Sequence, residues 1–319
     1  MNKKIGVIMS AYNENSDWIR ESVESILNQT YSNLRLYIVL DNPNNQELRE
    51  LLEYYESIDD RVELIKNKNN LGLVACLNLM INIVREDIIA RMDADDISDL
   101  HRFEKEMKYL DENNLDFVMT GANTIDEVGN VSVGDKIPNL VANDIKNIAK
   151  YGISSIHSSW LLKKEVYISL NGYRNIKYCE DLDFLLRAIQ AGYKIGRLKE
   201  NLQLYRIRST SLSQTYSLEQ YEKAKYLKQA FSKNIAINFL DVDDINNKFE
   251  NYSKQEINNF MKSKNEIEEF SKLLYSKKII QCLFNIIKNI LSDRLYRKLF
   301  VNYFISRSKT IMYYRKIGE

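Results

Sequence analysis

Three aspartates lie within four residues of this sequence, directly after a short apolar run. The stretch at positions 88–100 reads IIARMDADDISDL, and its clustered acids are Asp93, Asp95 and Asp96. Carboxylates this close repel one another beside a buried strand, so we expect a positive group among them. Asp93 and Asp95, separated by Ala94, can converge on one divalent cation. Because oxygen ligands select hard ions, Mg²⁺ or Mn²⁺ is the expected metal.

Other interpretations of the acidic cluster compete with a metal–nucleotide site. A calcium loop needs an oxygen ligand and then a glycine at its fifth and sixth positions, where this chain has Ile97 and Ser98. A haloacid-dehalogenase-like phosphatase carries D-x-D on its first strand, whereas several strand–helix units come first here. Short acidic clusters are also common on protein surfaces, so the D-x-D pattern alone is weak support for function.

The elements that must position these acids alternate between strand and helix patterns. Strands are expected at 5–9, 34–40, 62–65, 88–92, 116–120, 157–162, 194–198 and 202–207, and helices at 18–27, 48–55, 73–81, 163–170 and 179–190. Repeated strand–helix units predict a parallel sheet covered on both faces. Ligands of such sheets bind beyond the carboxyl ends of the strands.

Polar residues follow the other strands as well. The first strand runs into a segment made of Ser10, Ala11, Tyr12, Asn13 and Glu14. The Tyr12 ring could stack on a base, and Asp41 at the end of the second strand could accept an imide N–H. After the third strand, Asn70 and Gly72 let the backbone approach a ligand closely. Each position has an ordinary structural explanation, such as a turn or a helix start, but together they favour a ligand site at one edge.

Composition sets limits on the class of protein. The 319-residue chain is 45% hydrophobic and 28% charged with a formal net charge of +1, which indicates a globular fold and excludes nucleic-acid binding by bulk charge. Three widely spaced cysteines (Cys76, Cys179 and Cys282) and two histidines argue against a zinc site. The apolar stretch 279–291 is too short to span a bilayer.

The sequence from about residue 217 onward is helical in pattern, with no strand signal. We therefore predict a boundary between 1–216 and 217–319. From residue 271 to the end there are eleven Lys or Arg residues, two acids and interleaved aromatics. This composition suits an anionic membrane surface, and a helical subdomain packed on the core explains it equally well. No nucleic-acid motif accompanies the charge, so no nucleic-acid partner is expected.

Several motifs in order resemble the family 2 inverting glycosyltransferases with the GT-A fold. They are VIMSAYNENSDWIRESVESILNQTYSNLRLYIVLDN, NNLGLVACLN and IARMDADDIS, followed less densely by HSSWLLKKEVYISLNGYRN, CEDLDFLLRAIQAGY and YRIRSTSLS. The resemblance covers about residues 4–213. It implies an α/β fold with a Rossmann-like, mainly parallel sheet flanked by helices. Residues 1–216 would be the catalytic domain and 217–319 a basic helical extension.

The resemblance also implies roles for individual residues. The segment 10–14 and Asp41 would hold the nucleotide base, Asp93 would lie at the ribose or the metal, and Asp95 would bind the metal on the diphosphate. In the Glu180–Asp181 pair, Asp181 would be the base that takes a proton from the acceptor hydroxyl as it attacks the anomeric carbon. The ordinary explanation for this pair is that acids favour a helix N-terminus.

The sequence departs from the family pattern in three places. Leu40 replaces one of two acids at the end of the second strand, so Asp41 alone is expected to contact the base. Leu100 stands where relatives often have proline. Arg208 stands where many relatives have a metal-binding histidine, and it could contact the diphosphate directly. We expect His157 to line the acceptor site or to serve the structure.

The activity that the resemblance implies is metal-dependent inverting transfer of a hexose or N-acetylhexosamine from a nucleotide-diphosphate sugar, expected to be UDP-linked. The acceptor would be a glycan hydroxyl, carried on a polyprenyl lipid during bacterial capsule or surface polysaccharide assembly at the cytoplasmic face of the cell membrane. Two other classes stay open from the residues: a metal-dependent phosphatase or nucleotidyltransferase, and a non-catalytic scaffold that binds nucleotide or glycan.

Overall fold

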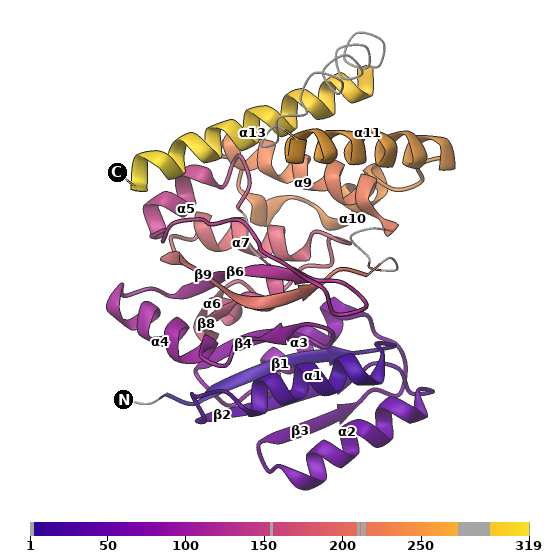
Figure 1. Cartoon of the computed structure of the whole chain (residues 1–319), viewed down its shortest axis with the longest axis vertical. Helices are drawn as coiled ribbons and strands as arrows, with labels where there is room; N and C mark the ends of the chain where they lie inside the picture. The colour runs from indigo at the N-terminus through magenta and orange to yellow at the C-terminus, as the bar shows by residue number, and fades with distance from the viewer. Residues whose placement is uncertain (1–2, 154–155, 209–210, 212–214, 274–293, 319) are drawn as a thin grey trace.

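The computed structural model describes residues 3–318 except 154–155, 209–210, 212–214 and 274–293. Within these residues one nine-stranded sheet runs through the molecule in the order β3-β2-β1-β4-β8-β6-β9-β5, with β7 paired to β6 (Figure 1). The strands are β1 (Ile5–Ala11), β2 (Leu34–Leu40), β3 (Val62–Lys66), β4 (Ile88–Asp93), β5 (Ile97–Ser98), β6 (Phe117–Ile125), β7 (Val131–Ser132), β8 (Leu161–Lys163) and β9 (Ile195–Arg206).

The first four strands form the parallel half of the sheet, as the sequence predicts. β1 lies between β2 and β4, and β3 adds to β2, all in parallel. Their residues form nearly continuous apolar runs because both faces of the sheet are covered. The register pairs Ser10 with Asp93 and Ala11 with Leu40. The residues that follow these strands therefore emerge at one edge of the sheet.

Helices cover both faces of this half. α1 (Ser16–Leu27), α2 (Gln46–Ile58) and α4 (Arg102–Glu112) bury residues in the cluster on one face, while α3 (Leu73–Ile83) and α7 (Glu180–Gln190) bury residues in the cluster on the other. α1 begins after Asn15, whose side chain accepts a hydrogen bond from the Asp17 N–H at 2.8 Å. Asn15 therefore caps this helix. α4 has no counterpart among the predicted helices.

The second half of the sheet is mixed, which modifies the prediction of a mainly parallel sheet. β8 runs antiparallel between β4 and β6, whereas β6 and β9 are parallel. The expected strand 157–162 is wrong at its start, because His157–Ser159 form a 3₁₀ turn before β8. The two strands expected at 194–198 and 202–207 are one strand, β9, which pairs with β6 through two register shifts.

Most of the remaining helices lie beyond the second half of the sheet, with α9, α11 and α13 at the end of the molecule opposite β2 and β3, while α6 lies beside β8 (Figure 1). They are α5 (Ala142–Ile148), α6 (Lys164–Ser169), α9 (Ser217–Ser232), α10 (Val242–Lys248), α11 (Lys254–Leu273) and α13 (Arg294–Gly318). α9 contributes Leu227 and Ala230 to the main core, and Tyr313 and Tyr314 of α13 pack against it. The C-terminal helices are therefore joined to the sheet by buried contacts, while the boundary at residue 217 stays a prediction.

Membrane-spanning helices are absent from the part of the chain that the structure describes, since none there is both long and apolar enough. The apolar stretch 279–291, with Cys282, lies wholly outside the described residues. The other two cysteines, Cys76 and Cys179, are buried and free.

Candidate active site

The end of β2 is joined to the start of α3 through one buried carboxylate. Asp41 is 3% exposed and accepts hydrogen bonds from the Asn67 side chain at 2.7 Å and from the backbone N–H groups of Leu71 and Gly72 at 2.9 and 2.8 Å. Asn70 also accepts from the Gly72 N–H, at 3.0 Å. Because a carboxylate has about four lone-pair sites, Asp41 keeps capacity for one further donor, such as a base N–H.

The segment after β1 is tied to the end of β2. Asn13 accepts hydrogen bonds from the side chains of Asn42 and Asn45 at 2.6 and 3.2 Å. Tyr12 donates its backbone N–H to the Glu14 carboxylate at 2.7 Å, and the residue is 42% exposed. The ring is therefore accessible at the same edge as Asp41, in a position where a planar base could lie against it.

Arginines supply the positive charge that the acidic cluster requires. Arg91, buried on β4, places its Nη2 atom 2.5 Å from Asp93 Oδ1, and Arg208 places Nε 2.8 Å from Asp95 Oδ2. Buried Arg206, at the end of β9, donates Nε–H to the backbone oxygen of Asp95 at 2.8 Å. Arg208 was predicted from the sequence, whereas Arg91 and Arg206 were not. For Arg91 a signal was present, since residues two apart on a strand share a face.

The three clustered acids differ in their surroundings. Burial and the charge of Asp93 raise the pKa of Asp95 to about 6. Asp96 is fully buried, accepts from the Ser158 hydroxyl at 2.5 Å and from the Arg206 backbone N–H at 2.9 Å, and burial raises its pKa well above the usual range. Asp96 therefore joins the turn after β4 to β9 and the 3₁₀ turn. Asp93 is more open, with 30% of its side chain exposed.

Glu180 and Asp181 form the first turn of α7. Burial and the neighbouring Asp181 charge raise the pKa of Glu180 to about 7, and burial raises the pKa of Asp181 as well. The Leu182 backbone N–H donates to Asp181 Oδ1 at 2.6 Å, which lowers that pKa in part. The Arg91 charge lowers both pKa values, and the Asp93 charge raises both. The strand-edge acids and the helix acids thus share one electrostatic neighbourhood around Arg91.

The first turn of α7 is held by buried contacts on both sides. Asp183 accepts from Arg174 and, at 2.8 Å, from Arg187 Nε–H, and Arg187 also donates to the Leu170 and Gly172 carbonyls at 2.7 and 2.9 Å. These positioning residues were not predicted, although Asp183 and Arg187 have the i, i+4 spacing of a helical ion pair.

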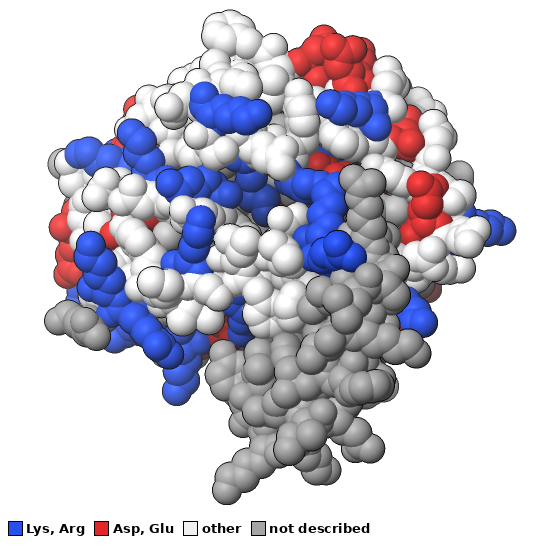
Figure 2. Space-filling model, turned by 90° about the horizontal axis from the view of Figure 1, so that it is seen from above, with Lys and Arg blue, Asp and Glu red and all other residues white. Residues whose placement is uncertain are grey.

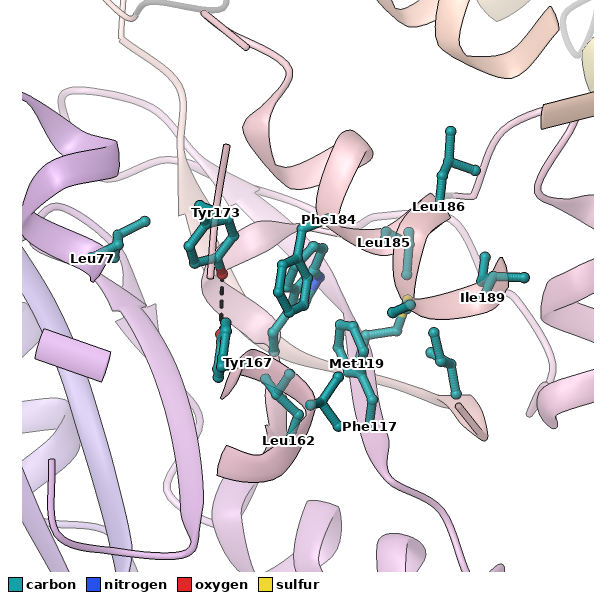
Figure 3. Close-up of a cluster of buried hydrophobic side chains, with 14 of the residues drawn as sticks. Leu77, Phe117, Met119, Leu162, Tyr167, Tyr173, Phe184, Leu185, Leu186 and Ile189 are labelled. Atoms are coloured by element: carbon teal, nitrogen blue, oxygen red, sulfur yellow. Dashed lines mark hydrogen bonds between the residues drawn. The ribbon is translucent and has the colours of Figure 1, made fainter. Parts of the chain in front are cut away.

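Aromatic packing fixes the same helix from below (Figure 3). Phe184 of α7 lies 4.9 Å from both Tyr167 and Tyr173, measured between ring centroids, and the two tyrosine hydroxyls are 3.0 Å apart. The Tyr173 hydroxyl is also 2.7 Å from His157 Nε2. Burial and the Arg91 charge lower the pKa of His157 well below its usual value, so its ring is neutral. His157 is therefore part of this aromatic support.

The residues entering α7 also take an uncommon backbone conformation. Tyr178 has φ +67°, in the left-handed region, and its ring stacks on Tyr216 at 4.2 Å. Such a conformation costs a non-glycine residue roughly 1–2 kcal/mol, and strained residues often lie at functional sites. The stack joins the segment before Glu180 and Asp181 to the start of α9.

A divalent cation could be held here only with help from a ligand. In the described part of the chain no three His, Cys, Asp or Glu side chains gather in a metal-binding group. The ion pairs of Asp93 and Asp95 each use one carboxylate oxygen, Oδ1 and Oδ2 respectively. Mg²⁺ is commonly bound by one or two carboxylates plus substrate phosphates, so these residues fit a cation that arrives with a diphosphate.

Comparisons with known proteins agree with this architecture. The model of Glycosyl transferase family 2 matches residues 6–168, about half of the chain. The chain is 36% identical over 204 residues to an uncharacterised glycosyltransferase of Methanocaldococcus jannaschii, covering 64% of this chain and 70% of the relative. It is 34% identical over 240 residues to the O-antigen biosynthesis glycosyltransferase WbnJ of Escherichia coli, covering 74% of this chain and 92% of that one.

Two further similarities extend this comparison. The amylovoran biosynthesis glycosyltransferase AmsE of Erwinia amylovora is 30% identical over 203 residues, covering 63% of this chain and 75% of the relative. The crystal structure of S. aureus TarS 1–349 superposes with a TM-score of 0.56 at 15% identity, covering 98% of this chain and 81% of that one, which shows a shared fold. This chain belongs to glycosyl transferase family 2, and it is a glycosyltransferase with the GT-A fold.

Proposed function

We propose that this glycosyltransferase moves a sugar from a nucleotide-diphosphate donor, UDP-linked, to a glycan hydroxyl with inversion at the anomeric carbon. The observation that carries the proposal is the shared neighbourhood of Asp93 and Asp181 around Arg91. A donor bound at the strand edge and a base on α7 could then act on the same sugar.

The donor would lie along the edge formed by the ends of β1, β2 and β4. Tyr12 would stack on the base, and Asp41 would accept a base N–H through its remaining lone pair. Asp93 would contact the ribose or the cation, with Ala94 in the backbone that follows. Arg208 would weaken its ion pair with Asp95 and donate hydrogen bonds to the diphosphate, because a planar guanidinium matches phosphate oxygens well.

Mg²⁺ or Mn²⁺ would be held by Asp95, with Asp93 beside it, and by the donor diphosphate. When bound, the cation neutralises negative charge on the departing nucleotide diphosphate. The buried carboxylate of Asp95, whose pKa is about 6, is mostly ionised at pH 7 and so is available as a ligand. Arg208 would share the same task from the protein side.

Asp181 would act as the general base. Its Oδ1 atom already accepts the Leu182 N–H, so Oδ2 is the atom that would receive the proton of the acceptor hydroxyl. Burial makes this carboxylate more basic than a surface aspartate, which suits proton transfer near neutral pH. A single displacement by that hydroxyl, on the face opposite the departing diphosphate, inverts the anomeric configuration.

The acceptor that we propose is a growing surface glycan on a lipid carrier. The names of WbnJ and AmsE assign those relatives to O-antigen and amylovoran biosynthesis, which supports a surface polysaccharide. The exposed face of α13 supports peripheral contact with the cytoplasmic side of an anionic membrane. Its exposed residues recur at helical spacing: Arg297, Lys298, Val301, Ile305, Ser308, Lys309, Met312, Arg315 and Lys316. Figure 2 looks onto this side of the molecule and shows many basic side chains there.

Turnover assays with a panel of UDP-sugars, Mg²⁺ or Mn²⁺ and a glycan acceptor test the proposed function. We expect Asp181→Asn to lower kcat by about 10²–10⁴-fold, the usual contribution of a general base. We expect Asp95→Asn to lower metal-dependent turnover by about a hundredfold or more, because it removes the cation's main protein ligand. Asp111→Asn, at an exposed position on α4, is the matched control and should keep full activity.

Other outcomes of the same assay would contradict the proposal. Full turnover by Asp181→Asn or Asp95→Asn would contradict the assigned roles. Acceptor-independent phosphate release from sugar phosphates would indicate a phosphatase or nucleotidyltransferase. UDP binding without turnover on any acceptor would indicate a binding scaffold.

A further inference from the structure

A cavity of about 920 Å³ lies between α7 and the C-terminal helices. Asp181 and Leu182 line it from α7, and α9, α11 and α13 supply much of the remaining wall. Neither Asp93 nor Asp95 lines it. The cavity is therefore separate from the donor edge but includes the proposed base, and its volume is in the range of small-molecule sites.

The charge of the lining is strongly positive. Six cations face the cavity, namely Lys136, Lys150, Lys225, Lys228, Lys264 and Arg307, against two acids, Asp135 and Asp181. Lys225 is paired with Glu222 at 2.9 Å. Lys228 and Lys264 are half-buried, and neither makes an ion pair within the described residues.

Lys228 is the cation whose position most requires an anion. It lies on α9, three residues from Lys225, so both project from the same helical face. Burial lowers the pKa of Lys228, which means that the charged form is held there at a cost. An anion in the cavity would remove that cost. Hydroxyl and aromatic groups, including Ser217, Tyr221 and Tyr303, also line the wall and suit a sugar.

We propose that this cavity is the acceptor site and that it recognises a phosphate group carried by the acceptor, with Lys228 and Lys264 as its binding cations. The inference rests on the proposed transferase function, which supplies the role of Asp181. The phosphate sits among the lysines while the sugar hydroxyl that receives the new residue reaches Asp181. The phosphate belongs either to the diphosphate of a lipid carrier or to the glycan itself.

Calorimetry on the full chain tests this site without any knowledge of the natural acceptor. The probes are inorganic diphosphate, farnesyl diphosphate and glucose 6-phosphate, each titrated without divalent metal. For the probe that binds wild-type protein, we expect the Kd to rise by about tenfold or more in the double variant Lys228→Gln/Lys264→Gln, since each lost lysine removes a charge-assisted hydrogen bond to the phosphate. Lys228→Arg keeps the charge and should retain binding, which separates lost recognition from lost folding.

Two control variants assign the binding to the cavity. Lys233→Gln, at the exposed end of α9, should leave the Kd unchanged. Arg208→Gln alters the donor edge and should weaken UDP but not the cavity probe. UDP affinity is measured separately in every variant, so failure to bind UDP would count against the proposed function and not against this site.

The three probes also distinguish the source of the phosphate. Tighter binding of farnesyl diphosphate than of glucose 6-phosphate supports a lipid carrier, and the reverse order supports phosphate within the glycan. Binding of none of the probes, or equal affinity in wild type and the double variant, would overturn the proposal.

Discussion

Arg91 explains how the acids of the candidate site can lie so close together. Its guanidinium pairs with Asp93, while its Nε and Nη1 atoms are buried and have no hydrogen-bond partner among the residues that the structure describes. The same positive charge lowers the pKa values of Glu180 and Asp181. Arg91 is therefore a positioning residue that acts on the base through its charge.

Removal of this charge should change the pH dependence of turnover. The base is active when deprotonated, so kcat/KM rises as pH passes the pKa of Asp181. Arg91→Met removes a charge that lowers this pKa, and we expect the rising limb to move to higher pH by about 1–3 units. Arg91→Lys keeps a positive charge and should shift the limb less. The measurement is kcat/KM for the donor as a function of pH, at a saturating concentration of the acceptor.

Arg35→Met is the control for this series. Arg35 makes an ion pair with Glu63, with 3.0 Å between Nη1 and Oε2, and this pair is not part of the site around the α7 acids. Its limb should coincide with that of wild type. An unshifted limb in Arg91→Met would show that Arg91 does not act on the base.

At the scale of elements, the loop between β3 and α3 depends on one glycine. Gly72 has φ +83° and caps the start of α3, and no atom of the described residues beyond its chain neighbours lies within 4 Å of the place where a Cβ would be. The conformation, and not a lack of space, is what favours glycine here. Because Asp41 accepts a hydrogen bond from the Gly72 N–H, any change in this backbone also moves the carboxylate that is proposed to contact the nucleotide base.

Gly72→Ala should therefore affect both stability and nucleotide binding. We expect a loss of about 1–2 kcal/mol in the free energy of unfolding from the left-handed backbone, together with weaker UDP binding. Gly129 offers a matched control, with φ +96° and equally open space in a distant turn. Gly129→Ala should cost similar stability and leave the UDP affinity unchanged. Denaturant unfolding and calorimetry measure the two effects, and equal UDP affinity in both variants would contradict the role of this loop.

The sequence predicts the elements of the parallel half well because long apolar runs and helical spacing are local signals. It fails at 157–159, where the Ser158 hydroxyl binds Asp96 and the Ser159 hydroxyl donates to the Ile156 carbonyl at 2.7 Å. These contacts favour a 3₁₀ turn over a strand. It also divides β9, because the polar residues at 199–201 resemble a turn, whereas in the structure Asn201 pairs with Gly121 of β6 after a register shift.

The candidate site was predictable in part, because some of its residues stand in local sequence patterns. Asp93, Asp95 and Asp181 stand in recognisable motifs, and their assigned roles stay predictions. Of the arginines around these acids, Arg91 stands on the same strand as Asp93, whereas Arg206 of β9 donates its backbone N–H to Asp96 across 110 positions of sequence. Single-sequence patterns carry no information on such long-range pairs.

At the scale of the whole molecule, the C-terminal helices both close the proposed acceptor cavity and present a basic surface. α13 packs inward through Tyr313, whose hydroxyl donates to Asp144 at 3.0 Å, and outward it exposes cations around Met312, which is 71% exposed. One helix could therefore hold the enzyme at a membrane and line the site for a lipid-borne acceptor.

Charge reversal on α13 tests the membrane contact in the full chain. Lys309→Glu, Arg315→Glu and Lys316→Glu together should lower co-sedimentation with anionic vesicles by about a hundredfold or more in partition coefficient, since each cation is worth about 1 kcal/mol at such a surface. Reversal of Lys3, Lys68 and Lys108, exposed residues outside the C-terminal helices, changes the net charge equally and should have little effect. Equal losses in the two triple variants would show that only the bulk charge matters.

The stereochemistry of slow donor hydrolysis tests the central proposal most directly, because water replaces the unidentified acceptor. The measurement is proton NMR of the first sugar released from an α-linked UDP-sugar, recorded before the anomers equilibrate. We expect the β-anomer first, and we expect release to fall by about 10²–10⁴-fold in Asp181→Asn. Initial release of the α-anomer, or an unchanged rate in Asp181→Asn, would contradict inverting transfer with Asp181 as the base.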